Sequence, residues 1–363
     1  MDQRAVTGSG PTRKDTATGI FRRSINWRLR SVKEIFPQRL SQILNLYMFD
    51  TRKIHLEISS KCVIKCPRCP RTELHPDTLN KEFSLQDFQT AFNTDILGEI
   101  EEFLFCGDIG DPIYARDFLP IVEYIKNNSD IRLKITTNGS YKKEDWWTKL
   151  GELLDANDII TFSVDGWNQE SNNRYRVNTD FESILLGIRT LKKISAVHVR
   201  WKAIYFSYNE YDMFRIRELA ESVGCDDFKT VKSTKFDNQY AVNGYDPLKP
   251  ETHYATAGQY IEETHVFKKS FPMDKDYRTS RHPWAKCMNN EKELFVNVEG
   301  LLLPCPWFNS GYVNNPFVAE YREQLNIKTR GLKAVVGDVL WQELVKSFDT
   351  NPLKICQIKC KNR

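Results

Sequence analysis

The stretch Ile54–Pro70 reads IHLEISSKCVIKCPRCP, a short β-rich run followed directly by three closely spaced cysteines. Cys62, Cys66 and Cys69 form the pattern C-x3-C-x2-C on a loop that leaves the first predicted strand. Three thiolates on one short loop can hold three corners of a cubane iron–sulfur cluster, because thiolate is the ligand that such clusters use. The fourth iron then has no protein ligand, and an open coordination position allows a reaction.

A structural zinc site is the alternative for this loop. Zinc sites favour pairs such as C-x2-C that a second pair completes, and a three-cysteine loop matches that arrangement less well. The chain has nine cysteines, an odd number, and its polar start MDQRAVTGSGPTRKDTATG lacks the apolar core of a secretory signal. We therefore expect a cytoplasmic protein, and we interpret its cysteines as metal or redox ligands in preference to disulfides.

The overall composition indicates a water-soluble globular protein. The 363 residues are 40% apolar and 28% charged, and no uncharged apolar run approaches the ~18 residues of a membrane span. The net charge is +4, and residues 1–40 alone hold nine Lys/Arg against three Asp/Glu. We expect a basic arm and helical flap over residues 1–49. A solvated tail is the preferred interpretation of the arm, and a contact with nucleic acid is the alternative.

Short β-rich runs alternate with amphipathic segments along residues 50–235, which is typical of repeated strand–helix units with parallel strands. Six strands are predicted: Ile54–Ile58, Glu102–Cys106, Ile131–Thr136, Ile159–Val164, Val197–Phe206 and Phe228–Lys232. One helix is predicted to begin at Ser84, with Asp87 in the capping-box position and Phe92 and Ile96 on its apolar face. The fold class is therefore α/β, a partial (β/α)6 TIM-like barrel.

The sequence after the barrel predicts two further regions. Residues 236–282 show no sustained periodicity and are predicted to form a connecting or lid segment. Glu293–Val298 and Leu301–Pro304 flank a turn at Glu299-Gly300 and predict a β-hairpin. We expect residues 283–363 to form a small α+β domain with a helix at Val339–Phe348.

The cysteine loop resembles the signature of the radical S-adenosylmethionine (radical SAM) superfamily, and the resemblance covers roughly residues 50–235. It implies that Cys62, Cys66 and Cys69 bind a 4Fe–4S cluster whose unique iron is chelated by the amino and carboxylate groups of SAM. One departure is Arg68, because the family position before the third cysteine is usually aromatic. In a parallel barrel chemistry gathers at the carboxyl ends of the strands, where every candidate motif of this chain lies.

The segment GDIGDP, Gly107–Pro112, resembles the Gly-Gly-Glu-Pro element of the family. The resemblance implies that Gly110 and Asp111 receive the methionine ammonium group of SAM, with Asp in place of the usual Glu. A glycine permits close backbone approach and a carboxylate complements a cation, so the residue types suit that role. A plain turn is the alternative.

Two later segments are further candidates for the SAM pocket. SVDG and the following RYR resemble the family segment in which a serine meets the SAM ribose and an arginine meets its carboxylate. Ser163 and Arg176 are the residues implied, with Arg174 as the alternative arginine. Asn138 in TTNG is a candidate for lining the pocket, although a strand-ending turn uses the same residues.

A second group of cysteines lies near the carboxyl end of the chain. Cys287 and Cys305 stand in the pattern C-x12-G-x4-C, and Cys356 and Cys360 read C-x3-C. Four thiolates suffice to close a second cubane, and a four-cysteine zinc site is the alternative. The spacing resembles the twitch domain, a shortened relative of the SPASM domain, although the tail pair departs from the C-x2-C of related dehydrogenases. The remaining cysteines, Cys106 and Cys225, are assigned to the core.

The resemblance implies an oxidoreductase that cleaves SAM reductively to a 5′-deoxyadenosyl radical, abstracts a hydrogen from an unactivated C–H bond and oxidises the substrate radical through the auxiliary cluster. It implies two 4Fe–4S clusters, SAM, and a low-potential electron donor of the flavodoxin or ferredoxin type. About fifty residues precede the barrel, which favours a small molecule or a separately delivered peptide as substrate.

Three alternatives to this function stay open. The first two are radical SAM enzymes, one that modifies a ribosomally made peptide (RiPP) and one that modifies a nucleotide or RNA. The third, from another class, is a zinc-stabilised nucleic-acid-binding protein. The sequence identifies no general base.

Overall fold

The computed structural model describes residues 52–73, 79–233, 236, 242–243, 245–255, 261–267, 293–309 and 316–350. The chain forms two compact units, residues 1–50 and 51–363, and all described residues belong to the second unit. The predicted arm and flap over residues 1–49 lie outside the described residues. The predicted boundaries after residues 235 and 282 stay predictions.

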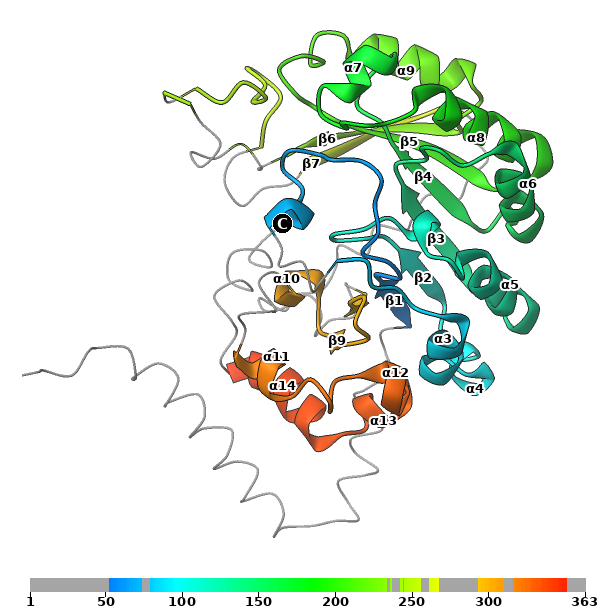
Figure 1. Ribbon diagram of the computed structural model, residues 1–363, viewed down its shortest axis with the longest axis vertical. Coiled ribbons are helices and arrows are strands. Elements are labelled where there is room, and N and C mark those ends of the chain that lie inside the picture. The colour runs from blue at the N-terminus through cyan, green and yellow to red at the C-terminus, as the bar shows by residue number, and fades with distance from the viewer. Residues whose placement is uncertain are drawn as a thin grey trace, which may run out of the picture. The chain divides into compact units, whose positions relative to one another are not determined.

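A mostly parallel sheet of nine strands organises this unit, in the order β7-β6-β5-β4-β3-β2-β1-β8-β9. The parallel strands that follow one another along the chain are β1 (Lys53–Leu56), β2 (Glu102–Phe105), β3 (Arg132–Thr137), β4 (Ile159–Ser163), β5 (His198–Ile204) and β6 (Asp227–Lys232). All six predicted strands are confirmed, with small differences at their ends. Among the described residues the sheet does not close on itself, so the architecture is a partial TIM-like barrel (Figure 1).

Helices connect the consecutive strands, and α5, α6 and α8 line one side of the sheet (Figure 1). The connecting elements are η1 (Pro70–Glu73), α3 (Leu85–Ala91), α4 (Thr94–Leu97), η3 (Pro112–Tyr114), α5 (Phe118–Asn128), α6 (Glu144–Leu153), α7 (Gln169–Asn173), α8 (Phe181–Ile194) and α9 (Met213–Ser222). Alternate strand residues such as Phe103, Phe105 and Phe162 are fully buried. This alternation places the other strand residues, among them Lys134 and Lys202, on the opposite face.

The helix predicted from Ser84 begins as expected but ends earlier. Ser84 and Asp87 form a reciprocal capping box at the start of α3. The helix ends at Ala91, because the Asn93 side chain accepts a hydrogen bond from the backbone N–H of Ile96 and starts α4 instead. Phe92 and Ile96 are buried as predicted, but they do not share one helix.

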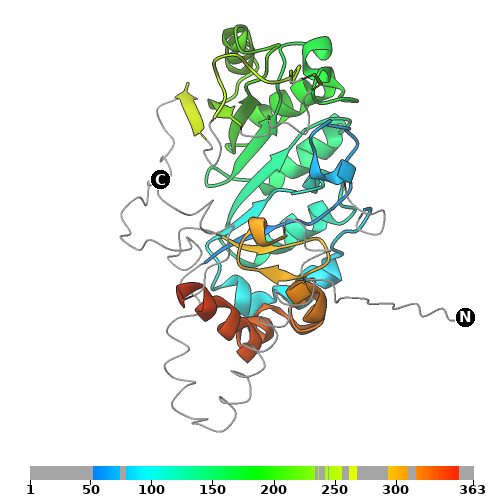
Figure 2. The same cartoon turned by 90° about the vertical axis from the view of Figure 1, so that its left-hand side faces the viewer.

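The predicted β-hairpin is confirmed, and it extends the barrel sheet. β8 (Leu294–Val296) and β9 (Leu302–Leu303) are antiparallel, and Gly300 in their turn has a φ of 88° that favours glycine. β8 also pairs in parallel with β1, with Val296 opposite Leu56 (Figure 2). The residues that lead to Cys305 therefore run beside the strand that leads to the cysteine loop.

Several elements were not predicted. β7 (Ile261–Val266) lies within the segment predicted as a connection, and it pairs antiparallel with β6. Short helices follow the hairpin: α10 (Pro306–Asn309), α11 (Pro316–Glu320), α12 (Ile327–Arg330) and α13 (Leu332–Val336). The final predicted helix is confirmed as α14 (Val339–Thr350). No helix in the described part of the chain combines the length and apolar character needed to cross a bilayer.

Candidate functional site

The cysteine loop lies at the carboxyl end of β1 and is held from several sides. The backbone N–H of Lys65 donates to the carbonyl of Val177 (2.8 Å), and the Asn178 side chain donates to the carbonyl of Val63 (2.8 Å). Cys66 is buried, whereas Cys62 and Cys69 are half-buried. The three cysteines pack in one cluster with aromatic side chains, namely Tyr175, Phe206 and Tyr208. The fold thus brings the three predicted ligands together.

The GDIGDP loop packs directly against the start of the cysteine loop. A Cβ on Gly110 would lie 1.9 Å from the carbonyl oxygen of Ser59, so the glycine is required by contact between the two backbones. The carboxyl group of Asp111 is buried and accepts hydrogen bonds from the Thr137 hydroxyl (3.0 Å) and the Asn138 backbone N–H (2.6 Å). Burial raises the pKa of Asp111 to about 6, although these hydrogen bonds oppose the rise.

Asp111 therefore faces the end of β3. The predicted contact of Gly110 and Asp111 with the methionine ammonium group stays a prediction. What the geometry adds is that Asp111 fixes the position of Asn138, whose side-chain amide lies 2.5 Å from the same carboxyl oxygen.

The loop after β4 brings two arginines to the same edge of the sheet. Arg176 pairs with the buried carboxylate of Asp165, at 2.7 Å between Nε and Oδ2. Burial raises the pKa of the Cys66 thiol to about 11, and the charge of Arg176 partly offsets this. Arg174 lies over the ring of Tyr208 at 4.8 Å. Both arginines thus lie near the aromatic cluster around the cysteine loop, and Ser163 ends β4 as a half-buried residue.

A cavity of about 170 Å³ is lined in part by Arg68, the residue before the third cysteine. Its lining comes from the cysteine loop, from the loop after β4 and from the ends of β5 and β6: Arg68, Tyr175, Ile204, Phe206, Val231, Ser233 and Phe236. The Arg68 guanidinium lies 5.1 Å from the centre of the Phe236 ring. Apolar and aromatic walls with a few polar groups are typical of a site for a small organic ligand.

The segment 245–255, called the strap below, is fastened beside this cavity. Asp246 pairs with Arg68, and both side chains are buried. Glu210 accepts hydrogen bonds from the backbone N–H groups of Glu251 (2.7 Å) and Thr252 (3.1 Å). The sequence analysis noted Arg68 only as a departure from an aromatic residue. Its partner Asp246 was missed, because a single aspartate in a segment without periodicity gives no signal.

Residues 56–206, from the end of β1 to the cavity wall, match the Radical SAM superfamily. This segment of the chain is therefore similar to the Radical SAM superfamily. Its sequence is 24% identical over 177 residues to a probable GTP 3′,8-cyclase of Methanocaldococcus jannaschii, with 48% of this chain and 57% of that protein covered. The chain thus spans little more than half the length of this curated relative.

Solved structures share the fold of the radical SAM domain at low sequence identity. SuiB of Streptococcus suis bound to precursor peptide SuiA has a TM-score of 0.55 at 16% identity, covering 93% of this chain and 74% of SuiB. A structure of SuiB bound to S-adenosylmethionine has a TM-score of 0.51 at 16% identity, covering 82% and 73%. Native anSMEcpe with bound AdoMet and the Cp18Cys peptide has a TM-score of 0.51 at 14% identity, covering 81% and 82%.

The donor chemistry of the loop fits the 4Fe–4S cluster of the radical SAM family. Burial, the negative charge of Asp111 and the neighbouring thiols raise the pKa of Cys62 to about 12. Buried thiols that oppose one another's ionisation become thiolates when a metal centre compensates their charge. Within the described ranges, no three His, Cys, Asp or Glu side chains converge closely enough to hold a single metal ion.

The predicted second cluster is reached only in part. Cys305 is half-buried just before α10, and its carbonyl accepts the N–H of Phe308. Cys287, Cys356 and Cys360 lie outside the described residues, so this ligand set stays a prediction. Cys225 is buried in the core as predicted, whereas Cys106 is only half-buried at the end of β2.

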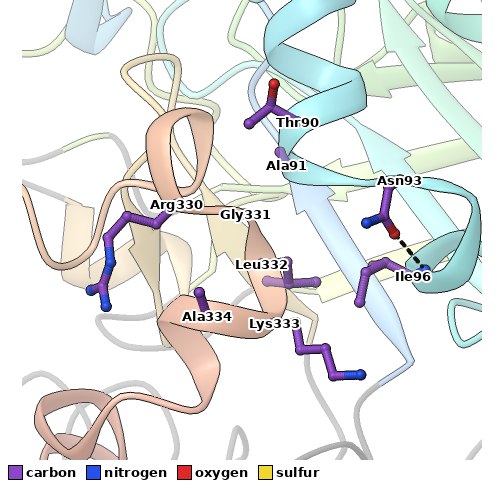
Figure 3. Close-up of a pocket in the computed structure, with 9 residues that line it drawn as sticks. All are labelled: Thr90, Ala91, Asn93, Ile96, Arg330, Gly331, Leu332, Lys333 and Ala334. Atoms are coloured by element: carbon purple, nitrogen blue, oxygen red, sulfur yellow. Dashed lines mark hydrogen bonds between the residues drawn. The ribbon is translucent and has the colours of Figure 1, made fainter.

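A larger cavity is lined by residues outside the cysteine loop. It has a volume of about 340 Å³ and lies between α3 and α4 on one side and α12 and α13 on the other (Figure 3). Figure 3 shows the Asn93 side chain turned to the backbone of Ile96, where it caps α4. Its lining holds no cysteine, histidine or carboxylate, and we assign it no part in the radical SAM chemistry.

Proposed function

We propose that this protein binds a 4Fe–4S cluster through Cys62, Cys66 and Cys69, binds SAM on its open iron, and abstracts a hydrogen from an unactivated C–H bond of its substrate. The observation that supports this most directly is three cysteines packed together at the carboxyl end of β1, beside a cavity lined by the ends of β5 and β6. The bound cluster and SAM supply the one-electron chemistry that yields a 5′-deoxyadenosyl radical. The chain binds, orients and excludes water.

The cavity beside Cys69 is proposed to take the adenosine part of SAM. The planar guanidinium of Arg68, held by Asp246 and stacked near Phe236, supplies a flat wall in place of the usual aromatic residue. Phe206 lines the same cavity, and the ring of Tyr208 stacks on the ring of Phe206 with 5.5 Å between their centres. Such walls keep water from the reacting atoms.

Ser163, Arg176, Gly110 and Asp111 are proposed as SAM contacts, as the family motifs imply. Arg176 already balances the charge of Asp165, so a carboxylate of SAM would join an existing ion pair. Arg174 is the alternative, because cation–π contact with Tyr208 holds its guanidinium at the same edge.

We further propose that Cys287, Cys305, Cys356 and Cys360 hold an auxiliary 4Fe–4S cluster in a twitch or SPASM-like domain, and that this cluster accepts an electron from the substrate radical. The position of Cys305 supports this. It follows the hairpin whose first strand pairs with β1, the strand that leads to the SAM-binding loop. A soluble electron donor of the flavodoxin or ferredoxin type in the cytoplasm completes the proposal.

The substrate is proposed to be a peptide or a small molecule. Two structures that share the fold contain a peptide, SuiA in SuiB and Cp18Cys in anSMEcpe, which supports a peptide. The name of the curated relative, probable GTP 3′,8-cyclase, supports a nucleotide as the second candidate.

Anaerobic reconstitution with iron and sulfide tests the proposal. We expect brown protein that converts SAM and dithionite to 5′-deoxyadenosine, and complete loss of this activity in Cys66→Ala. Cys106→Ala is the matched control, because Cys106 is a half-buried cysteine at the same edge but outside the loop. Colourless protein with stoichiometric zinc and salt-sensitive nucleic-acid binding would instead support the zinc alternative.

A further inference from the structure

The side-chain amide of Asn138 lies between a buried carboxyl group and a cysteine of the loop. Asn138 follows β3 and is 3% exposed. Its Nδ2 atom lies 2.5 Å from Oδ2 of Asp111 and 3.8 Å from Sγ of Cys62. An amide NH2 group has two hydrogens to donate, and these two acceptors take one each.

The neighbours of Asn138 determine which end of its amide faces the sulfur. Oδ1 accepts a hydrogen bond from the backbone N–H of Ser140 (3.0 Å), whereas the single hydroxyl hydrogen of Tyr114 goes to the nearer carbonyl oxygen of Ser140 (2.7 Å). A flipped amide would set its NH2 group against the N–H of Ser140 and its oxygen against the carboxyl group of Asp111. Both contacts would be repulsive, so an N–H bond points at Cys62.

Both donor positions of this amide are used within the protein. Its two hydrogens go to Asp111 and Cys62, and Oδ1 accepts from Ser140. The amide has no donor left for the carboxylate or ribose of SAM. The prediction that Asn138 lines the SAM pocket stays a prediction.

We propose that Asn138 is a positioning residue that donates an N–H···S hydrogen bond to the Cys62 thiolate and raises the reduction potential of the cluster. Reduction adds negative charge to a cluster, and a hydrogen bond to a ligand sulfur stabilises that charge. Asp111 and Ser140 hold the amide so that the donor keeps its direction. The inference rests on the proposed function, because it requires the cluster on Cys62.

A redox titration followed by electron paramagnetic resonance, without SAM, tests the inference independently of turnover. Asn138→Leu has nearly the same shape but no N–H donor, and its midpoint potential is expected to shift to more negative values. Thr137→Val is the matched control, because it removes another donor to the same oxygen of Asp111 but no bond to sulfur. Equal potentials of wild type and Asn138→Leu at equal iron content, or equal shifts in both variants, would overturn the inference.

A measurement on the unmutated protein covers the case in which Asn138→Leu does not fold. Protein grown with asparagine labelled with ¹⁵N in the side-chain amide is reduced and examined by pulsed electron paramagnetic resonance. A ¹⁵N hyperfine coupling to the reduced cluster is expected, and its absence would overturn the inference. Wild-type protein that cleaves SAM but lacks this coupling refutes only the role of Asn138, whereas protein that binds no cluster refutes the proposed function as well.

Discussion

The two edges of the parallel sheet use buried charge in opposite ways. Where the strands begin, Asp158 accepts the N–H of Leu133 and pairs with Lys126, and Asp226 accepts the N–H of Val199. Where the strands end, Tyr208 and Asp246 each hold a buried polar atom without a hydrogen-bond partner among the described residues, and Glu102 at the start of β2 is the exception at the first edge. Unsatisfied buried groups cost stability. Buried charge at the first edge is paired at Asp158 and Asp226, whereas the second edge carries the proposed binding site.

The largest expected effect comes from Glu57 at the carboxyl edge. This buried side chain accepts hydrogen bonds from the N–H groups of Ile109 (2.7 Å) and Val298 (3.4 Å), and burial raises its pKa to about 8. The unfolded chain releases this proton near pH 4.5 and the folded chain near pH 8, so the free energy of unfolding falls as the pH rises between these values. One pKa unit is worth about 1.4 kcal/mol, so the total fall is on the order of 5 kcal/mol.

Glu57→Gln is expected to remove this alkaline slope, because glutamine resembles the neutral acid. Urea unfolding between pH 5 and pH 9 measures it. Glu262→Gln is the matched control. Burial of Glu262 is outweighed by Lys202 and Lys229, so its pKa falls to about 2 and its contribution is lost only as the pH falls below about 4.5. If the free energy of unfolding of Glu57→Gln still fell between pH 5 and pH 8 as in the wild type, the buried Glu57 carboxyl group would not be the cause of that fall.

The next effect is expected at the edge where strands begin. Lys126 pairs with two aspartates, of which Asp158 is fully buried and Asp155 is 60% exposed. Asp158→Asn sets an NH2 group against the backbone N–H of Leu133 or Asp155, and it is expected to lower the free energy of unfolding by about 3 kcal/mol. Asp155→Asn is expected to cost less than about 1 kcal/mol, because it is a surface pair. Equal losses in denaturant unfolding would contradict the distinction between the two pairs.

Much of the fold was predictable because it repeats local rules. Alternating β-rich and amphipathic runs gave all six parallel strands, and Ser84 with Asp87 marked a helix start through bonds made within four residues. β7 was missed because its pairing with β6 is decided at long range, and its sequence IEETHV lacks the apolar alternation of a half-buried strand. The short helices after the hairpin were missed because four or five residues are too few to show a helical periodicity.

The candidate site was predictable only where it is contiguous in sequence. The spacing of Cys62, Cys66 and Cys69 was enough to predict them as cluster ligands. Pairs such as Arg68 with Asp246 depend on chain separations that no local pattern records. The glycine of GDIGDP was expected to admit a ligand, yet Gly110 is already needed for its contact with Ser59.

The smallest expected effect concerns the strap, and it sharpens the comparison of the two edges. Asp246→Asn keeps the size of the side chain but weakens the charge-assisted bond that holds Arg68 beside the cavity. SAM binding by the reconstituted protein, measured by anaerobic calorimetry, is expected to weaken about tenfold, which corresponds to about 1.4 kcal/mol. Glu263→Gln, which loses an exposed pair with Lys232, is the control and should bind SAM as the wild type does. The contrary result is that Asp246→Asn binds SAM normally but loses as much free energy of unfolding as Asp158→Asn does. The Arg68–Asp246 pair would then stabilise the fold, as the Lys126–Asp158 pair does at the opposite edge, and would not contribute to SAM binding.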